Sequence, residues 1–161
     1  MHLTELFDEN MIELHGEYSS QTNFFKKISS RLQELQYVKE EFCNKIQERE
    51  KKFPTGLVTK SFDVAIPHTD PEYVKRSFIY VIRLKPTLAF CKMGTDPMEH
   101  ELVYPKLIFL LGVNKGELQL TILQSLMKLF SNEKQMSSLL EIKEKSSFLQ
   151  HLQKYLSTNE I

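Results

Sequence analysis

The stretch KLIFLLGV, residues 106–113, decides the fold because it is an almost unbroken apolar run of strand length. A short apolar run bounded by turn residues is typical of a strand that is buried on both faces. The run is far shorter than the roughly 18 apolar residues that indicate a membrane-spanning helix. We therefore expect residues 106–113 to form an interior strand of a sheet.

Three other segments have the composition of strands. Residues 77–84 (SFIYVIRL) are rich in β-branched and aromatic side chains, and residues 88–91 are a shorter run of the same kind. Residues 62–66 (FDVAI) alternate apolar with polar or small residues and end at Pro67. Proline residues and the turn at residues 94–97 separate these runs. We expect all the strands to lie in one sheet.

Helical periodicity precedes and follows the strands. Apolar residues at helical spacing predict a helix over residues 22–36, after the capping residue Ser20. A second helix is expected after Val38 and before Pro54, with acidic residues in its first turn. From Glu117 onward the apolar spacing is again helical and predicts three C-terminal helices.

This order of elements predicts an α/β fold. Helices before and after the strands favour a single three-layer domain over residues 1–161, a mixed β-sheet flanked by helices on both faces. A chain of 161 residues is long enough to bury such a core without metal or disulfide support. Cys43 and Cys91 lie far apart and lack the spacing of a metal or redox site, so we expect no metal and no cofactor.

The charge balance excludes several classes of partner. Lys plus Arg and Asp plus Glu both total 21, so the formal net charge is zero. Without a long-range positive field, we expect no binding to nucleic acid and no direct insertion into a membrane. Residues 1–9 carry acids where a secretory signal needs basic residues, which predicts a cytoplasmic protein. Four scattered histidines are expected at the surface, namely His2, His15, His100 and His151.

Arg49 is the first candidate for a functional side chain. Phe42, Ile46 and Arg49 are spaced i, i+4 and i+7, which places the arginine on the inward face of the second helix. Its charged neighbours are expected to point elsewhere, namely Glu48, Glu50 and Lys51. An arginine that leans inward needs an anionic partner.

His68 is the second candidate, because the segment IPHTDP at residues 66–71 places it directly after a strand and between two prolines. Prolines restrict the backbone and so hold the imidazole in place. A neutral imidazole, with an ordinary pKa of about 6.5, has a nucleophilic nitrogen near neutral pH and can accept a phosphoryl group. The planar guanidinium of Arg49 would then suit the phosphoryl oxygens.

Supporting groups are predicted on the flanking turns. Backbone N–H groups and the hydroxyl of Thr55-Gly56 could add donors around a phosphate. Asp70 could orient the His68 ring through a carboxylate hydrogen bond, but no Ser or Cys in a nucleophile-elbow pattern accompanies them. Hydrolase chemistry is therefore not expected.

The residues alone also allow ordinary structural explanations. A lone histidine after a strand is more often a turn residue with local hydrogen bonds than a catalyst. The charged end of Arg49 could lie in solvent above a partly buried stem, and Thr55-Gly56 could be a simple turn. On spacing alone these explanations are the more frequent ones.

The same residues resemble a known family. REK at residues 49–51, FPTGL at residues 53–57 and VAIPHTD at residues 64–70 resemble the signature of the fructose/mannitol-type enzyme IIA of the sugar phosphotransferase system. The version found here most resembles the galactitol-specific branch. The similarity covers most of the chain, continuing through Met93-Gly94, residues 106–111 and residues 118–130.

The resemblance implies a fold, a reaction and partners. The family fold is a mixed sheet flanked by helices, and its histidine takes phosphate from the carrier HPr and passes it to a cysteine of enzyme IIB. Sugar then arrives through the membrane-embedded enzyme IIC, which is an indirect partner. Carried over to this sequence, the phosphate-accepting histidine is His68 and the phosphate-site arginine is Arg49, with Thr55, Gly56, Thr69 and Asp70 as neighbouring residues of the motif.

One position departs from the family pattern. Many relatives carry a second active-site histidine at the start of the helix after the last core strand, where this sequence has Glu117. A carboxylate there would disfavour a nearby phosphoryl group unless it turns away. Residues 1–18 match the family weakly. Partner recognition is expected to use an exposed apolar rim around the histidine, namely Phe53, Leu57, Pro71 and Tyr73.

Three functions stay open at this level. The first is an enzyme IIA component of a transport system for a sugar or sugar alcohol such as galactitol. The second is a regulatory carrier whose phosphorylation at His68 controls a binding partner. The third, an interaction domain that has lost phosphotransfer, is weakened because His68 and Arg49 are both present.

Overall fold

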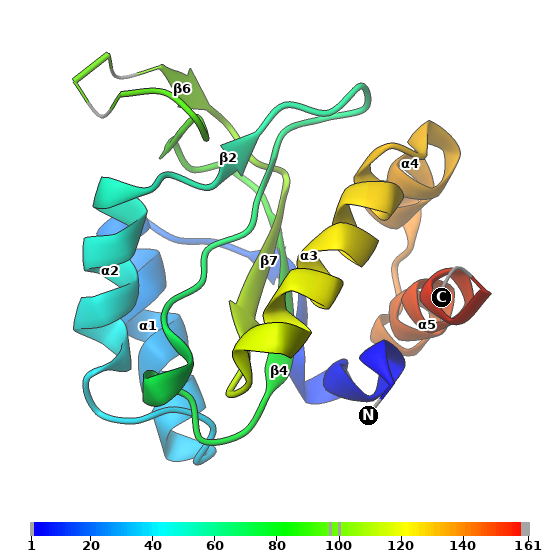
Figure 1. The fold of residues 1–161 in the computed structure, drawn as a ribbon. Helices are drawn as coiled ribbons and strands as arrows, with labels where there is room; N and C mark the ends of the chain where they lie inside the picture. Colours follow the sequence, from blue (N-terminus) through cyan, green and yellow to red (C-terminus); the bar gives the residue numbers. More distant parts are fainter. Residues whose placement is uncertain (1, 97, 100, 159–161) are drawn as a thin grey trace.

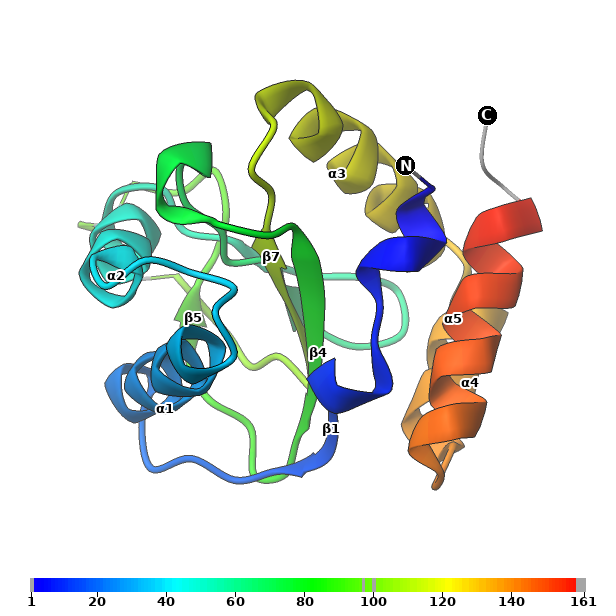
Figure 2. The ribbon, with the colours of Figure 1, turned by 90° about the horizontal axis from the view of Figure 1, so that it is seen from below.

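A five-stranded mixed sheet forms the centre of the computed structural model, which describes residues 2–96, 98–99 and 101–158 (Figures 1 and 2). The strand order is β1-β4-β7-β3-β2. β1 pairs parallel to β4 and β7 pairs parallel to β3, whereas the β4–β7 and β2–β3 pairs are antiparallel. In that order the strands are β1 (Ile12–Gly16), β4 (Phe78–Leu84), β7 (Leu107–Gly112), β3 (Val64–Ala65) and β2 (Gly56–Leu57).

Helices cover both faces of this sheet, as the two ribbon views show (Figures 1 and 2). α1 (Gln21–Glu34) and α2 (Phe42–Lys52) pack on one face. The other face carries α3 (Gly116–Phe130), α4 (Glu133–Glu141) and α5 (Lys145–Thr158). The three-layer mixed α/β fold expected from the sequence is therefore confirmed.

The central strands are buried on both faces, and their alternating side chains divide the core into two clusters. Leu107, Phe109 and Leu111 of β7 join the cluster under α3, α4 and α5, whereas Ile108 and Leu110 join the cluster under α1 and α2. This period of two follows from the pleat of a strand. It explains why residues 106–113 are continuously apolar rather than alternating.

Helix boundaries follow local signals. The Ser20 hydroxyl accepts a hydrogen bond from the Asn23 backbone N–H at 3.0 Å and caps α1, which begins one residue before the expected range. α2 ends at Lys52, before Pro54, as expected. Asn132 caps α4 in the same way by accepting from the Gln135 backbone N–H.

Several details of the expected sheet were wrong. Among the described residues, β5 (Phe90–Cys91) pairs with β6 (Leu102–Val103) in a separate two-stranded sheet, so the run at residues 88–91 lies outside the central sheet. The strand expected over residues 62–66 shortens to β3, and the turn at residues 53–57 contains β2. Short strands such as these depend on which backbone faces them, and the pattern of one segment does not contain that information.

The N-terminal segment contributes more than its weak family match indicated. β1 forms the edge strand beside β4, and two 3₁₀ turns precede it, η1 (Leu3–Leu6) and η2 (Glu9–Met11). A third such turn, η3 (Pro71–Tyr73), follows the predicted histidine motif. The expectations for Pro97 in the turn and for His100 at the surface lie outside the described residues.

In the described part of the chain, no helix combines the length and the apolar character needed to cross a membrane. The same residues contain no group of three or more His, Cys, Asp or Glu side chains placed to hold a metal ion. Cys43 and Cys91 are free thiols, each partly buried.

Candidate functional site

His68 lies on a loop that leaves β3 and is tied to the sheet by backbone hydrogen bonds. The Leu111 N–H of β7 donates to the Pro67 carbonyl at 3.0 Å. The Ile66 N–H donates to the Thr55 carbonyl at 3.3 Å. The two residues that precede His68 are therefore held by hydrogen bonds, and Thr69, which follows it, is buried. This anchoring restrains the backbone that carries the imidazole.

The imidazole of His68 has one nitrogen occupied and one available. Its Nδ1 lies 2.7 Å from the Ile66 carbonyl oxygen. Because a carbonyl only accepts, Nδ1 carries the hydrogen in the neutral ring and Nε2 keeps its lone pair. Asp70 was expected to orient the ring, but the Ile66 backbone carbonyl makes this contact instead.

Burial lowers the pKa of His68 below its ordinary value of 6.5. The hydrogen bond to Ile66 opposes this shift, the nearby charge of Arg49 adds to it, and the charge of Asp70 opposes it. The net direction favours the neutral ring. Near neutral pH the site therefore presents an unprotonated Nε2, as a nucleophilic imidazole requires.

Arg49 reaches the same site from the last turn of α2. Its Nη1 lies 3.5 Å from Asp70 Oδ1, and 35% of the arginine side chain and 61% of the aspartate side chain are exposed. Such a long, exposed pair stabilises the fold little. The guanidinium also lies 5.4 Å from the centre of the Phe53 ring. The arginine is thus held loosely and is half-buried rather than fully inward.

One donor of Arg49 is left without a partner. Its Nε is buried and makes no hydrogen bond with any described residue. A buried N–H group without an acceptor destabilises a protein by roughly 1–3 kcal/mol, so such groups often mark a functional site. An anionic group bound beside His68 would supply the missing acceptor and a counter-charge.

Glu50 corrects the sequence interpretation, which had it pointing away from the interior. Its side chain is 5% exposed, and its carboxylate accepts from the Thr55 backbone N–H at 3.0 Å and from the Thr55 hydroxyl at 2.9 and 3.0 Å. Phe42, Ile46 and Glu50 are spaced i, i+4 and i+8 and are the buried residues of α2. Burial raises the pKa of Glu50 to about 7, against the opposing effect of the two Thr55 donors.

Thr55 and Gly56 therefore act differently from the expectation that both would donate to a phosphate. The N–H and hydroxyl of Thr55 are taken by Glu50. A Cβ at Gly56 would lie 2.7 Å from the Cys91 carbonyl oxygen and would also meet the Val103 side chain. Gly56 is thus required by the close approach of β5 and β6 to β2.

Together these contacts form one connected path across the corner between α2 and β3, which we call the α2–β3 corner (Arg49, Glu50, Thr55, Ile66 and His68). The carboxylate of Glu50 holds Thr55, the Thr55 carbonyl accepts from Ile66, and the Ile66 carbonyl holds His68 Nδ1. The helix that carries Arg49 and the loop that carries His68 are therefore linked through three successive partners.

The remaining predicted residues lie at the border of this corner or outside it. Asp70 is exposed and contacts Arg49. Glu117 lies in the first turn of α3 and is exposed; within the described residues no hydrogen bond or ion pair joins it to His68 or Arg49. Of the four proposed rim residues, Phe53 is 57% exposed, whereas the others are partly buried, namely Leu57, Pro71 and Tyr73.

Comparison with known proteins gives the family. The family model described as phosphoenolpyruvate-dependent sugar phosphotransferase system, EIIA 2, matches residues 5–155. No curated protein matches the chain in sequence. Three similar solved structures share the fold at low identity.

The first is PtxA of Streptococcus mutans, assigned as a PTS IIA protein, with a TM-score of 0.75 and 19% identity over 99% of this chain and 98% of that one. The second is the complex of enzyme IIAMtl with phosphorylated enzyme IIBMtl of Escherichia coli, with a TM-score of 0.68 and 19% identity over 96% and 100%. The third is the nitrogen regulatory protein IIA-Ntr of Neisseria meningitidis, with a TM-score of 0.65 and 24% identity over 96% and 98%. Since the family model spans nearly the whole chain, this protein belongs to the type 2 EIIA family of the phosphoenolpyruvate-dependent sugar phosphotransferase system, whose members are phosphocarriers.

Proposed function

We propose that this protein is a cytoplasmic enzyme IIA that accepts a phosphoryl group on Nε2 of His68. The observation that carries the proposal is the bond between His68 Nδ1 and the Ile66 carbonyl, which leaves Nε2 as the free nucleophile. Family membership supports the class of reaction.

The first transfer is a displacement at phosphorus, with phospho-HPr as the donor. The lone pair of Nε2 attacks the phosphorus, and the bond from phosphorus to the donor nitrogen breaks with its electron pair returning to the donor. Because the ring is already neutral and Nδ1 is held, no base is needed to activate it. Arg49 stabilises the equatorial oxygens of the transferring group, with its unpartnered Nε as one donor.

The second transfer sends the phosphoryl group to a cysteine of enzyme IIB. The thiolate attacks phosphorus, the Nε2–phosphorus bond breaks, and the electron pair returns to Nε2. The Escherichia coli IIAMtl protein was solved in complex with phosphorylated IIBMtl, which supports this partner for a chain of the same fold. We propose a sugar alcohol such as galactitol as the final acceptor, delivered through enzyme IIC, on the resemblance of the motif region alone.

A regulatory role is the second candidate. The fold likeness to IIA-Ntr, a nitrogen regulatory protein, favours it. In that case His68 would still accept phosphate, and the phosphorylation state would control a binding partner rather than sugar uptake.

The test is intact-protein mass spectrometry after incubation with phosphoenolpyruvate, enzyme I and HPr. We expect one acid-labile phosphoryl adduct on the wild type and none on His68→Ala, while the matched control His15→Ala, at an exposed histidine of β1, keeps the adduct. No adduct on folded wild type, or an adduct on His68→Ala, would refute the proposal. Loss of the adduct on adding a purified enzyme IIB supports transport, and retention with every IIB tested supports regulation.

A further inference from the structure

A cavity lies at the end of the central strands opposite the loop that carries His68. It has a volume of about 840 Å³ and is bounded by the ends of β1 and β4, the residue before β7 and the C-terminus of α4. This volume falls within the range of about 300–1,000 Å³ that is usual for small-molecule sites. Its lining residues are Leu14, His15, Arg83, Leu84, Lys85, Pro86, Thr87, Lys106, Leu140, Glu141 and Lys143.

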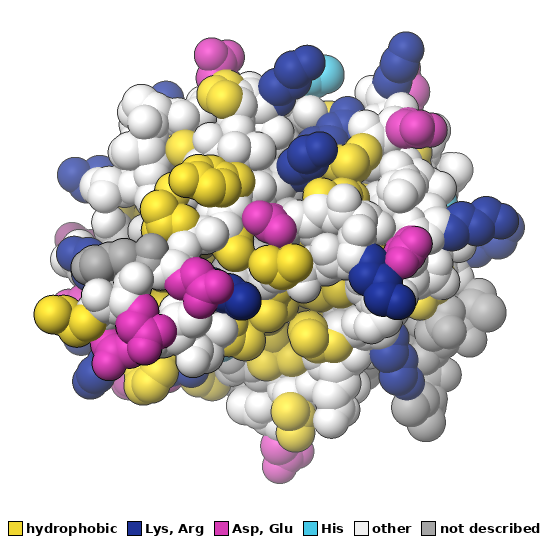
Figure 3. All heavy atoms as spheres, turned by 90° about the horizontal axis from the view of Figure 1, so that it is seen from above, with side chains coloured by type: hydrophobic (Ala, Val, Ile, Leu, Met, Phe, Trp, Pro, Cys, Tyr) yellow, Lys and Arg dark blue, Asp and Glu magenta, His cyan; other side chains and the backbone are white. Residues whose placement is uncertain are grey.

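Positive charge is concentrated in this cavity although the whole chain is neutral. Four of the lining residues are Lys or Arg, and Glu141 is the one acid among the lining residues. Within the described residues, no ion pair involves Lys85, Lys106 or Lys143. In the described part of the chain, these three ammonium groups are therefore not held in ion pairs. Figure 3, which views the molecule from above the orientation of Figure 1, shows basic and acidic side chains interspersed around hydrophobic atoms on this face.

Arg83 is fixed at the floor of the cavity by backbone carbonyls. Its Nε donates to Leu14 at 3.3 Å, and its Nη1 donates to Leu139 at 3.0 Å and to Ile142 at 2.7 Å. Two of these carbonyls belong to the C-terminal end of α4, whose partial negative charge would otherwise repel an anion. Nη2 makes no hydrogen bond with the described residues, so this side of the guanidinium remains available to a ligand.

Four apolar residues also line the cavity, namely Leu14 and Leu84 on the strands and Pro86 and Leu140 beside them. Apolar wall residues favour a ligand with an apolar or ring-shaped body over a bare inorganic ion. Several cations at one rim favour a group with more than one negative charge. We propose that this cavity binds an organic phosphate, a phosphate monoester on a compact ring body.

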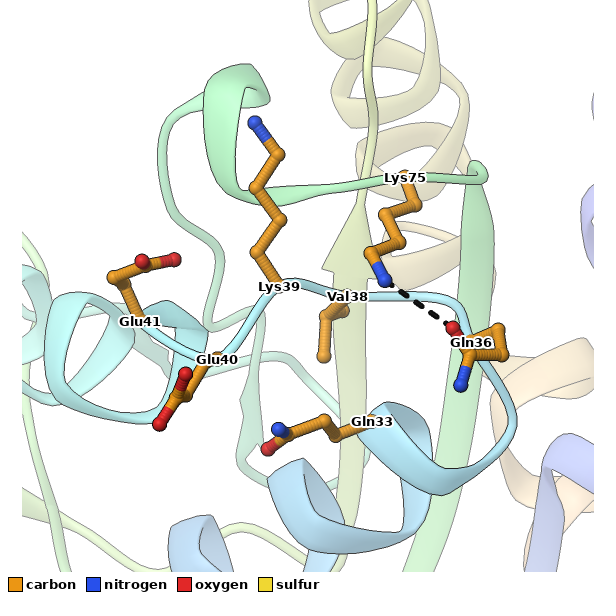
Figure 4. A pocket seen from close by; sticks show the side chains of 7 residues that line it. All are labelled: Gln33, Gln36, Val38, Lys39, Glu40, Glu41 and Lys75. Carbon is orange, nitrogen blue, oxygen red and sulfur yellow. Dashed lines mark hydrogen bonds between the residues drawn. The ribbon is translucent and has the colours of Figure 1, made fainter.

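A smaller cavity elsewhere provides the contrast. It lies beside the C-terminal end of α1 and is lined by two lysines and two glutamates, Lys39, Lys75, Glu40 and Glu41. In Figure 4, Lys75 turns toward Gln36, to which its Nζ donates at 3.2 Å, while Lys39 points away from it. Its charges are balanced and one lysine is already occupied, so this cavity serves as a control.

The proposed site is separate from the phosphotransfer histidine. Arg83 pairs with Leu107 at the beginning of β7, whereas the loop that carries His68 bonds to Leu111. Four residues of strand separate those positions by about 13 Å, and β4 and β1 lie beyond β7 from β3 in the sheet. A ligand here would therefore act without displacing the phosphoryl group.

Isothermal titration of the whole chain with adenosine monophosphate and with glucose phosphate tests the proposal. We expect saturable binding of at least one of these esters with a Kd of about 1 mM or tighter. Lys85→Gln combined with Lys106→Gln should weaken that binding at least about tenfold. The matched control, Lys39→Gln combined with Lys75→Gln, should leave it unchanged, and both double variants should still become phosphorylated at His68.

Three results would overturn the proposal. The first is no saturable binding of either ester to wild type that is phosphorylation-competent. The second is equal binding by the Lys85 and Lys106 double variant, provided that circular dichroism shows it folded. The third is binding of inorganic phosphate, or of a poly-glutamate peptide, as tightly as either ester. Since phosphorylation at His68 is measured separately, failure here leaves the proposed phosphotransfer standing.

Discussion

The last turn of α2 and the first turn of α3 each carry a glutamate, Glu50 and Glu117, and the two side chains have opposite environments. Glu50 is 5% exposed and binds Thr55 through both carboxylate oxygens. Glu117 is exposed and makes no hydrogen bond or ion pair with His68 or Arg49 in the described part of the chain. From the sequence, Glu50 was expected to point away from the interior, and the role of Glu117 was left open.

The difference shows how the buried face of a helix should be predicted near the end of the helix. Positions i+7 and i+8 both lie close to the stripe set by i and i+4, so Arg49 and Glu50 compete for the interior. A carboxylate with three donor contacts from Thr55 is satisfied there, whereas the longer arginine reaches out toward the site. A buried charged residue can thus stabilise the fold while its more exposed neighbour is free to bind a ligand.

The largest effect on the rate of phosphate transfer is expected at Arg49, the neighbour of Glu50 in α2. Arg49→Ala should slow phosphorylation of His68 by roughly 10²-fold, because it removes the principal group expected to neutralise the transferring phosphoryl oxygens. Arg49→Lys should recover part of the rate, since it keeps the charge and loses the planar fork. Rapid-quench measurement of phosphate transfer from phospho-HPr checks both. Lys51→Ala, an exposed cation on the same helix, is the control, and a folded Arg49→Ala protein with normal transfer would disprove the role.

The next largest effect is the change of protein stability with pH that arises from the Glu50 carboxyl. The pKa of Glu50 is raised from 4.5 to about 7, so the folded state binds the proton more tightly than the unfolded state. The free energy of unfolding of the wild type, relative to that of Glu50→Gln, should therefore fall by up to roughly 3 kcal/mol as the pH rises from about 4.5 to about 7. Above about pH 7 the difference should stay constant. Urea unfolding of both proteins across this pH range measures the difference.

Glu50→Ala should be less stable than Glu50→Gln, because it leaves the Thr55 N–H and hydroxyl without acceptors in a buried place, at roughly 1–3 kcal/mol. A pH-independent gap between wild type and Glu50→Gln would show that the carboxyl does not titrate in this range.

The smallest expected effect lies at Glu117. An exposed charge without a contact to the site is screened by water and salt, so Glu117→Gln should change the rate of phosphate transfer to His68 by no more than about twofold. The same rapid-quench assay at two salt concentrations checks this. A large, salt-dependent increase in rate would show that the Glu117 carboxylate lies close enough to repel the phosphoryl group, and would contradict this prediction.

Much of the fold could be predicted from local patterns. β4, β7 and the first two helices were expected close to their observed bounds, and three helices were expected from Glu117 onward, because long periodic segments carry their own signal. β1, β2 and β6 were missed, and β5 was assigned to the wrong sheet. These strands are short, and their identity depends on a partner backbone far away in the sequence.

The candidate site was predictable to a lesser depth. His68 and Arg49 were expected to be near one another, and the structure brings them together. The role of Glu50 was missed, although the i, i+4, i+8 spacing after Phe42 and Ile46 and a following Thr were signals that could have revealed it. Nothing in the local pattern indicated that the cationic residues of the cavity opposite the His68 loop, including Lys85 and Lys106, would meet around it, because they come from separate elements.

The amino-acid sequence by itself determined the class of the fold, the buried central strands and the histidine between two prolines, because these depend on periodicity and backbone restriction within a few residues. Only the tertiary structure decided which ring nitrogen of His68 is free, which glutamate is buried and where the lysines leave a cavity open. Hydrogen bonds, desolvation and counter-charges depend on neighbours that are distant in sequence, and those neighbours exist only once the layers have packed.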